Sequence, residues 1–233
     1  MVQASQTTPL NLRIKFKKVG TLQYISHLDL VRTMHKIIVR SKLPIWYTEG
    51  FNPKPKMVFA APLSIGSESM CEFMDIRLIE KMDQVKAKEL LNKNMTDEMQ
   101  VLDVYYPERK FNELRWFSYE IKIDTLNPTE NLAAEIENFL QGNAVLAEKK
   151  SKSGEMVKVD IRPLIKSVES RFDGKIITIK ALLSADQSAF LNPELVIKSL
   201  KERFGILSSA NLMSEHYSIM RCEAYDSSMN IFS

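Results

Sequence analysis

Two side chains near residue 27 have the chemistry of a general acid–base pair. His27 can take up or release a proton near neutral pH, and Asp29 can orient its ring. A histidine at a helix start can equally act as a hydrogen-bonding structural residue, so both roles stay open. The other two histidines, His35 and His216, are interpreted as structural.

A Pro-punctuated loop at residues 49–56, EGFNPKPK, has the chemistry of a binding element. Gly50 permits a left-handed turn, and the prolines limit the freedom of the chain. Aromatic side chains beside lysines can stack on a base and hold phosphates. The candidate binding residues of this region are Tyr47, Phe51, Asn52, Lys54 and Lys56. The alternative is a structural loop whose aromatic residues fill the core.

Basic residues are concentrated at the start of the chain. Residues 11–60 carry a net charge of +8, which leaves the rest of the chain at −5 within a total of +3. Such asymmetry is typical of proteins with an anionic partner. Arg32, Lys36 and Arg40 recur at helical spacing and therefore share one solvent face with Asp29. We predict that this face binds the partner.

Several classes of site are not supported by the sequence. Cys71 and Cys222 are far apart and are interpreted as buried, reduced thiols. The histidines are scattered, so we expect neither a metal nor a cofactor in this chain. No apolar run approaches the roughly 18–20 residues of a membrane helix. The first residues do not resemble a signal peptide, so we expect a cytoplasmic protein without a membrane partner.

The elements that position these residues form two βαββαβ-like halves in tandem. Strands are expected at 12–19, 45–47, 73–78, 100–105, 118–123, 145–149, 155–161, 175–182 and 214–225. Helices are expected after the N-cap Ser26 and at 84–91, 129–140 and 193–204. This order predicts an α+β protein of two tandem ferredoxin-like halves. A single larger sheet covered by helices on one face is the alternative.

The expected domain limits follow from the same order. Residues 1–10 are predicted to be a disordered leader, and residues 11–108 the first ferredoxin-like half. After a linker around 107–115, residues 116–226 form the second half, and 227–233 a tail.

Residues 24–59 resemble the radical-SAM-associated (radical-SAM-linked) proteins of bacteria, a domain of unknown function. The strongest matches are SHLDL at 26–30 and EGFNPxPK at 49–56, followed by Glu72 and Asp75. Weaker echoes continue at 160–163 (DIRP) and 221–225. Lys36 and Val39 stand where that family usually has arginine, and Lys54 where it often has histidine, so much of the charge is kept.

The resemblance implies a working association with a radical S-adenosylmethionine (SAM) protein, often one with a cobalamin-type domain. This chain lacks the CxxxCxxC motif of such enzymes, so the partner must supply the iron–sulphur cluster. Our main hypothesis is an accessory protein, not an enzyme on its own, that binds an RNA or ribonucleoprotein substrate for this partner. The alternatives are a metal-independent RNA-processing enzyme using His27 and a pure protein-interaction module.

Overall fold

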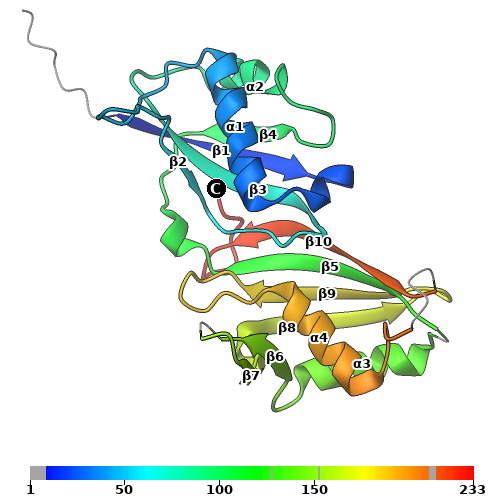
Figure 1. Ribbon diagram of the computed structural model, residues 1–233. Helices are drawn as coiled ribbons and strands as arrows, with labels where there is room; N and C mark the ends of the chain where they lie inside the picture. Colours follow the sequence, from blue (N-terminus) through cyan, green and yellow to red (C-terminus); the bar gives the residue numbers. More distant parts are fainter. Residues whose placement is uncertain (1–8, 127, 152, 210–213) are drawn as a thin grey trace, which may run out of the picture. The chain divides into compact units, whose positions relative to one another are not determined.

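The computed structural model describes residues 9–126, 128–151, 153–209 and 214–233 and divides the chain into two compact units (Figure 1). The first unit runs to Phe111 and includes Ser233, and the second runs from Asn112 to Phe232. Each unit combines α-helices with antiparallel strands, so the protein is of the α+β class. Most of the leader predicted at residues 1–10 lies outside the described residues.

The first unit is a sheet with helices on one face. Its elements are β1 (Leu10–Lys18), α1 (His27–Ser41), β2 (Met57–Phe59), β3 (Ser67–Leu78), α2 (Gln84–Asn92) and β4 (Val101–Tyr105). A 3-10 turn at Gly20–Tyr24 precedes α1. The strand order is β4-β1-β3, and the short strand β2 pairs with β3 along residues 74–76. Each of these pairings is antiparallel.

The core of the first unit forms where β1 and α1 turn their apolar sides toward each other. Leu12, Ile14 and Phe16 alternate along β1 and are fully buried, because side chains of a strand point to its two faces in turn. They join Met34 and Ile38 of α1 in one hydrophobic cluster. The apolar side of α1 therefore packs into the core, and its polar side remains on the surface.

The second unit contains a four-stranded sheet, two helices and a separate hairpin. Its elements are β5 (Trp116–Asp124), α3 (Glu130–Gln141), β6 (Leu146–Lys150), β7 (Met156–Asp160), β8 (Ile165–Phe172), β9 (Ile177–Ser184), α4 (Pro193–Phe204) and β10 (His216–Tyr225). The antiparallel order is β10-β5-β9-β8, while β6 pairs with β7. Short 3-10 turns span Phe111–Glu113, at the boundary of the units, and Arg162–Leu164. The rings of Phe139 and Phe204 join α3 to α4, with centroids 5.7 Å apart.

The structure differs from the predicted strands mainly at residues 45–47 and at β8, and β3 begins at Ser67 instead of residue 73. Residues 45–47 form only isolated bridges, and β2 takes the place of the second strand. Prolines at 44, 53 and 55 interrupt a regular ladder there, because proline has no N–H to donate. The sequence also did not predict β8, in which only Ile165 and Val168 are buried and a register shift breaks the alternation. The strands predicted at 145–149 and 155–161 form the separate β6–β7 hairpin.

The DIRP segment at 160–163 fastens that hairpin to its own unit. Asp160 accepts hydrogen bonds from the N–H groups of Val145 (2.9 Å) and Arg162 (3.0 Å). The guanidinium of Arg162 donates to the carbonyl oxygens of Gly142 (3.0 Å) and Ile165 (2.7 Å). These two bonds lower the pKa of Asp160, and the bond from Val145 has the larger effect. The side chains of Asp160 and Arg162 therefore both stabilise the structure of the second unit.

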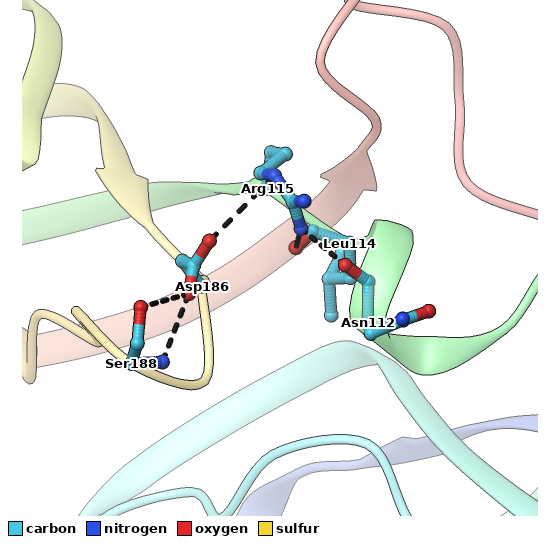
Figure 2. Close-up of polar contacts among 5 residues, drawn as sticks. All are labelled: Asn112, Leu114, Arg115, Asp186 and Ser188. Carbon is cyan, nitrogen blue, oxygen red and sulfur yellow. Dashed lines mark hydrogen bonds and ion pairs between the residues drawn. The ribbon is translucent and has the colours of Figure 1, made fainter.

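Arg115 fixes the beginning of β5 (Figure 2). Its Nη1 donates to the carbonyl oxygens of Leu114 (3.0 Å) and Asn112, and its Nε lies 3.6 Å from Oδ2 of Asp186. Asp186 also accepts from the N–H (2.8 Å) and hydroxyl (2.6 Å) of Ser188. The loop after β9 is thus tied to the first residues of the second unit.

Glu215 connects three segments of the second unit just before β10. Its carboxylate accepts from the hydroxyl of Thr125 and from the N–H groups of Leu126 (3.3 Å), Leu207 (2.9 Å) and Ser209 (2.7 Å). These bonds, that from Thr125 first, lower the pKa of Glu215 to about 2. A carboxylate that accepts several hydrogen bonds is favoured in its charged form.

We expect a Glu215→Gln variant to be less stable than the wild type at neutral pH but not in acid. The pKa of Glu215 is about 2 in the folded protein against a reference of 4.5. Its carboxylate therefore contributes stability above pH 4.5 that is lost as the pH falls through 2. Urea midpoints of the two proteins should differ at pH 7 and converge only as the pH falls to about 2. A difference that stays constant across this range would contradict the assignment.

Candidate functional site

The first turn of α1 is held by a compact polar network. Ser26 caps the helix: its Oγ accepts from the N–H of Asp29 (3.1 Å) and donates to Asp29 Oδ2 (2.7 Å). Nη1 of Arg32 donates to Asp29 Oδ1 (3.1 Å). The bonds from Ser26 and then Arg32 lower the pKa of Asp29. Asp29 therefore fixes the start of the helix and orients Arg32.

The structure does not bring the predicted acid–base pair into contact. His27 is exposed at the first position of α1, and its ring makes a T-shaped contact with the ring of Phe59, with centroids 5.4 Å apart. Within the described part of the chain, the carboxylate of Asp29 accepts from Ser26 and Arg32 and not from His27. This arrangement leaves the His27 ring without the carboxylate that was expected to orient it.

The EGFNPKPK loop is the tip of a small hairpin. An isolated bridge joins Tyr47 to Pro55, and the N–H of Thr48 donates to the carbonyl oxygen of Lys54 (3.0 Å). The N–H of Lys54 returns a bond to Oγ1 of Thr48 (3.1 Å). Gly50 has a φ of +119°, a conformation that side chains rarely adopt. The hairpin of residues 47–55 is thus fixed at its base and turns sharply near its tip.

A groove of about 580 Å³ lies between α1 and this hairpin with the residues after it. We call it the α1 groove. Its less exposed lining residues form the floor, which comprises Val31, His35, Pro55 and Met57. Its exposed lining residues form the rim, which comprises Leu28, Arg32, Lys36 and Lys54. The groove therefore combines a largely apolar floor with a cationic rim.

The cations of the rim are available to a ligand. The side chains of Lys36 and Lys54 form no hydrogen bond or ion pair with any other residue that the structure describes. Arg32 is paired with Asp29, but the two side chains are 64% and 57% exposed. Exposed pairs of this kind contribute about 0–1 kcal/mol, so a phosphate can compete for the guanidinium. Three of the predicted binding residues are thus brought to one cavity.

The other predicted binding residues lie around the groove rather than in its lining. Phe51 and Asn52 are exposed at the tip of the hairpin, and Tyr47 is exposed at its base. Lys56 is exposed in the segment between the hairpin and β2. Arg40 is exposed in the last turn of α1. These side chains extend the basic and aromatic surface beyond the groove itself.

Part of the charge counted in the sequence lies inside the first unit. Arg13 is 1% exposed and its guanidinium makes a bidentate contact with Asp75, at 2.7 and 2.9 Å. Lys18 is 2% exposed and donates to the carbonyl oxygens of Leu22 (3.1 Å) and Ser67 (2.9 Å). These two cations stabilise the fold and are not part of the binding face. Asp75, a residue of the family resemblance, is the partner of Arg13.

His35 is a residue of the groove that the sequence did not single out. It lines the floor, and its Nε2 is buried without a hydrogen-bond partner among the described residues. His35 follows Leu28 and Val31 at spacings of seven and four, which places the three on one side of α1. The helical spacing could be seen in the sequence. The sequence did not show that residues 54–57 lie over this side of α1 and complete the groove.

The described residues show no second centre of reactive groups. No three His, Cys, Asp or Glu side chains among them are placed to hold a metal ion. Burial raises the pKa of the Cys222 thiol, which disfavours the nucleophilic thiolate. A cavity of about 340 Å³ on the sheet of the second unit has Glu120, Glu169 and Lys180 in its lining, without a convergent charge. No described helix is long and apolar enough to cross a membrane.

The fold and the groove define an α+β protein of two units with a cationic site on the first. Residues 11–193 match the family described as "Uncharacterized protein conserved in bacteria (DUF2344)". This match spans most of the chain, so the protein belongs to that family.

Other comparisons add little to this assignment. No curated protein matches the sequence. Among solved structures, the chain is similar to an unknown protein from Galdieria sulphuraria, at 9% sequence identity and a TM-score of 0.27. That similarity covers 91% of this chain and 98% of the other, but it is too weak to assign a fold or a function.

Proposed function

We propose that this protein is a non-catalytic accessory protein that binds an RNA or ribonucleoprotein substrate and presents it to a radical SAM enzyme. The observation that carries the binding part is the convergence of Arg32, Lys36 and Lys54 on one groove. Cations that approach from a helix and from a facing hairpin can contact successive phosphates of one strand. The exposed ring of Phe51 adds a surface on which a base can stack.

The radical SAM part of the proposal rests on the sequence resemblance. The two cysteines, Cys71 and Cys222, cannot supply the three thiolates of a CxxxCxxC cluster site, so the cluster belongs to the partner. In this scheme the accessory protein contributes recognition of the substrate, and the radical chemistry takes place on the partner.

We further propose that each unit is a ferredoxin-like domain. The proposal is supported by the strand orders β4-β1-β3-β2 and β10-β5-β9-β8, in which all pairings are antiparallel. In both units one helix follows the first strand, and another connects the third strand of this scheme to the fourth. The β6–β7 hairpin is then an insertion between α3 and β8 of the second unit.

Crosslinking and sequencing of RNA bound to the protein in its own bacterial cells tests the binding proposal. The wild type is expected to enrich a defined set of RNAs. A variant with Arg32→Ala, Lys36→Ala and Lys54→Ala should lose it, because the cationic rim is removed. The His27→Ala variant should retain it, because His27 lies outside the groove lining. Absence of enriched RNA from the wild type would overturn the proposal and favour a protein-interaction module.

Two further readouts of the same experiment separate the alternatives. A radical SAM protein should co-purify with the wild type, and its absence would remove the presenting role while leaving RNA binding. Accumulation of unprocessed RNA in the His27→Ala cells would instead support the RNA-processing enzyme. Loss of about two or more decades of processing rate is the usual scale for removal of a general acid or base.

A further inference from the structure

The α1 groove has the dimensions of a site for a small, compact ligand. Its volume of about 580 Å³ lies within the range of about 300–1,000 Å³ that is usual for small-molecule pockets. It is bounded by little more than two turns of α1, from Leu28 to Lys36, and by residues 54–57. The groove thus has room for one small group and not for a long stretch of chain.

The floor and the rim differ in chemistry in a way that matches such a ligand. The floor residues Val31, Pro55 and Met57 offer apolar contact, which suits the face of an unstacked base. On the rim, Arg32 and Lys36 lie one helical turn apart and Lys54 belongs to the facing segment. An anionic group attached to the base can therefore meet cations from two sides.

His35 gives the floor a polar group beside its apolar residues. Its Nε2 is buried and has no hydrogen-bond partner among the residues described. Leaving a buried polar atom unpaired costs stability, and such atoms occur where a ligand or water completes the bonding. An imidazole beside an apolar floor suits a base, which carries donors and acceptors at its edge.

We propose that the α1 groove takes up one unstacked nucleotide of single-stranded RNA, with the base on the floor and its phosphate at the rim. This inference rests on the proposed function and names the form of RNA that the same site selects. A base paired in a duplex cannot present its face to the floor, so the groove selects single strands. Phe51, exposed at the tip of a hairpin fixed at its base, offers a stacking surface for a neighbouring base.

Affinity measurements with four probes test this inference on the full chain. The probes are a 12-nucleotide single-stranded RNA, the same RNA annealed to its complement, inorganic polyphosphate of equal charge, and a poly-glutamate peptide of equal charge. The single strand is expected to bind at least about tenfold more tightly than each of the others, the scale of one stacked base. Equal binding of duplex or polyphosphate would overturn the inference and leave charge-driven RNA binding intact. Equal binding of poly-glutamate would overturn it in favour of an acidic protein segment.

A His35→Leu variant separates the floor from the rim. It should weaken single-strand binding about tenfold while the salt dependence stays unchanged, because the three cations remain. Its thermal midpoint should be equal to or above that of the wild type, since an unsatisfied polar group has been replaced by an apolar one. Unchanged affinity for the single strand would overturn the assignment of His35 and the floor. Failure of the wild type to bind any RNA would instead overturn the proposed function.

Spectroscopy of the wild type provides a test that requires no substitution of the floor. The chain has three histidines, His27, His35 and His216, so their ring resonances can be assigned by substituting each in turn. Single-stranded RNA is expected to shift the resonances of His35, while polyphosphate should leave them nearly in place. Equal shifts with both probes would contradict insertion of a base.

Discussion

Replacing Arg32, Lys36 and Lys54 together by alanine is expected to weaken RNA binding about 100-fold in roughly 0.1 M salt. The side chains are exposed and line one groove, so each can make a charge-assisted bond to a phosphate. Three such contacts at about 1 kcal/mol each correspond to roughly two decades of affinity.

The salt dependence gives a second, independent readout of the same variant. Each phosphate contact on a single strand contributes about 0.7 to the slope of log affinity against log salt. Removing three contacts should therefore reduce this slope by about 2. Fluorescence anisotropy of a labelled RNA across a range of salt concentrations measures both quantities.

A charge-matched control variant tests whether the loss of affinity comes from the lower net charge alone. Lys86→Ala, Lys93→Ala and Lys175→Ala remove the same three charges from exposed positions outside the α1 groove. This control should lose no more than about threefold in affinity, because only long-range electrostatics change. Equal losses in the two variants would mean that the groove is not the site.

Replacing Asp75 by alanine is expected to destabilise the protein by about 3–5 kcal/mol. The carboxylate of Asp75 accepts two bonds from Arg13, whose side chain is 1% exposed and whose guanidinium lies 4.1 Å from the ring centroid of Phe111. Without Asp75, this buried guanidinium loses the carboxylate that it contacts at 2.7 and 2.9 Å, although it keeps its other contacts. Urea unfolding followed by circular dichroism measures the change.

Two comparisons show whether burial causes the effect. Glu169→Ala removes the partner of Arg171 from an exposed pair at 3.8 Å and should cost no more than about 1 kcal/mol. The double variant Arg13→Met/Asp75→Leu replaces both charges by apolar groups and should recover most of the stability. A loss of less than about 1 kcal/mol in the free energy of unfolding of Asp75→Ala would contradict the structural role assigned to the Arg13–Asp75 pair.

The local elements of this protein were largely readable from the sequence because they depend on neighbouring residues. Ser26 caps α1 through its own side chain, and the spacing of Leu30, Met34 and Ile38 gives that helix one buried side. Pro193 and Gly205 mark the limits of α4 in the same way. These signals act within a few residues, so no tertiary information was needed to find them.

Where the local signal was weak, the prediction failed. β8 has few buried residues and a register shift, so it lacks the alternation that identifies a strand. Its place beside β9 is set by pairing with a distant segment. The β6–β7 hairpin has stronger strand character, yet it pairs outside the main sheet of its unit.

The candidate site was likewise determined in part by the sequence and in part by the tertiary structure. The sequence determined that residues 24–59 are basic and aromatic, and that Arg32 and Lys36 share one side of a helix. It did not determine which cations are available, because burial depends on contacts between distant segments. Arg13 and Lys18 are bound inside the first unit, while Lys36 and Lys54 remain exposed.

Only the tertiary structure decided that His35 belongs to the groove and that Asp29 is held by Ser26 and Arg32 instead of His27. Residues 54–57 reach the side of α1 that carries His35 because the hairpin folds back at its Tyr47–Pro55 bridge. Helical spacing shows which residues of α1 share a side, but a groove also needs a second wall. Here that wall comes from a segment about twenty residues away in the sequence, and its position depends on the packing of the whole first unit.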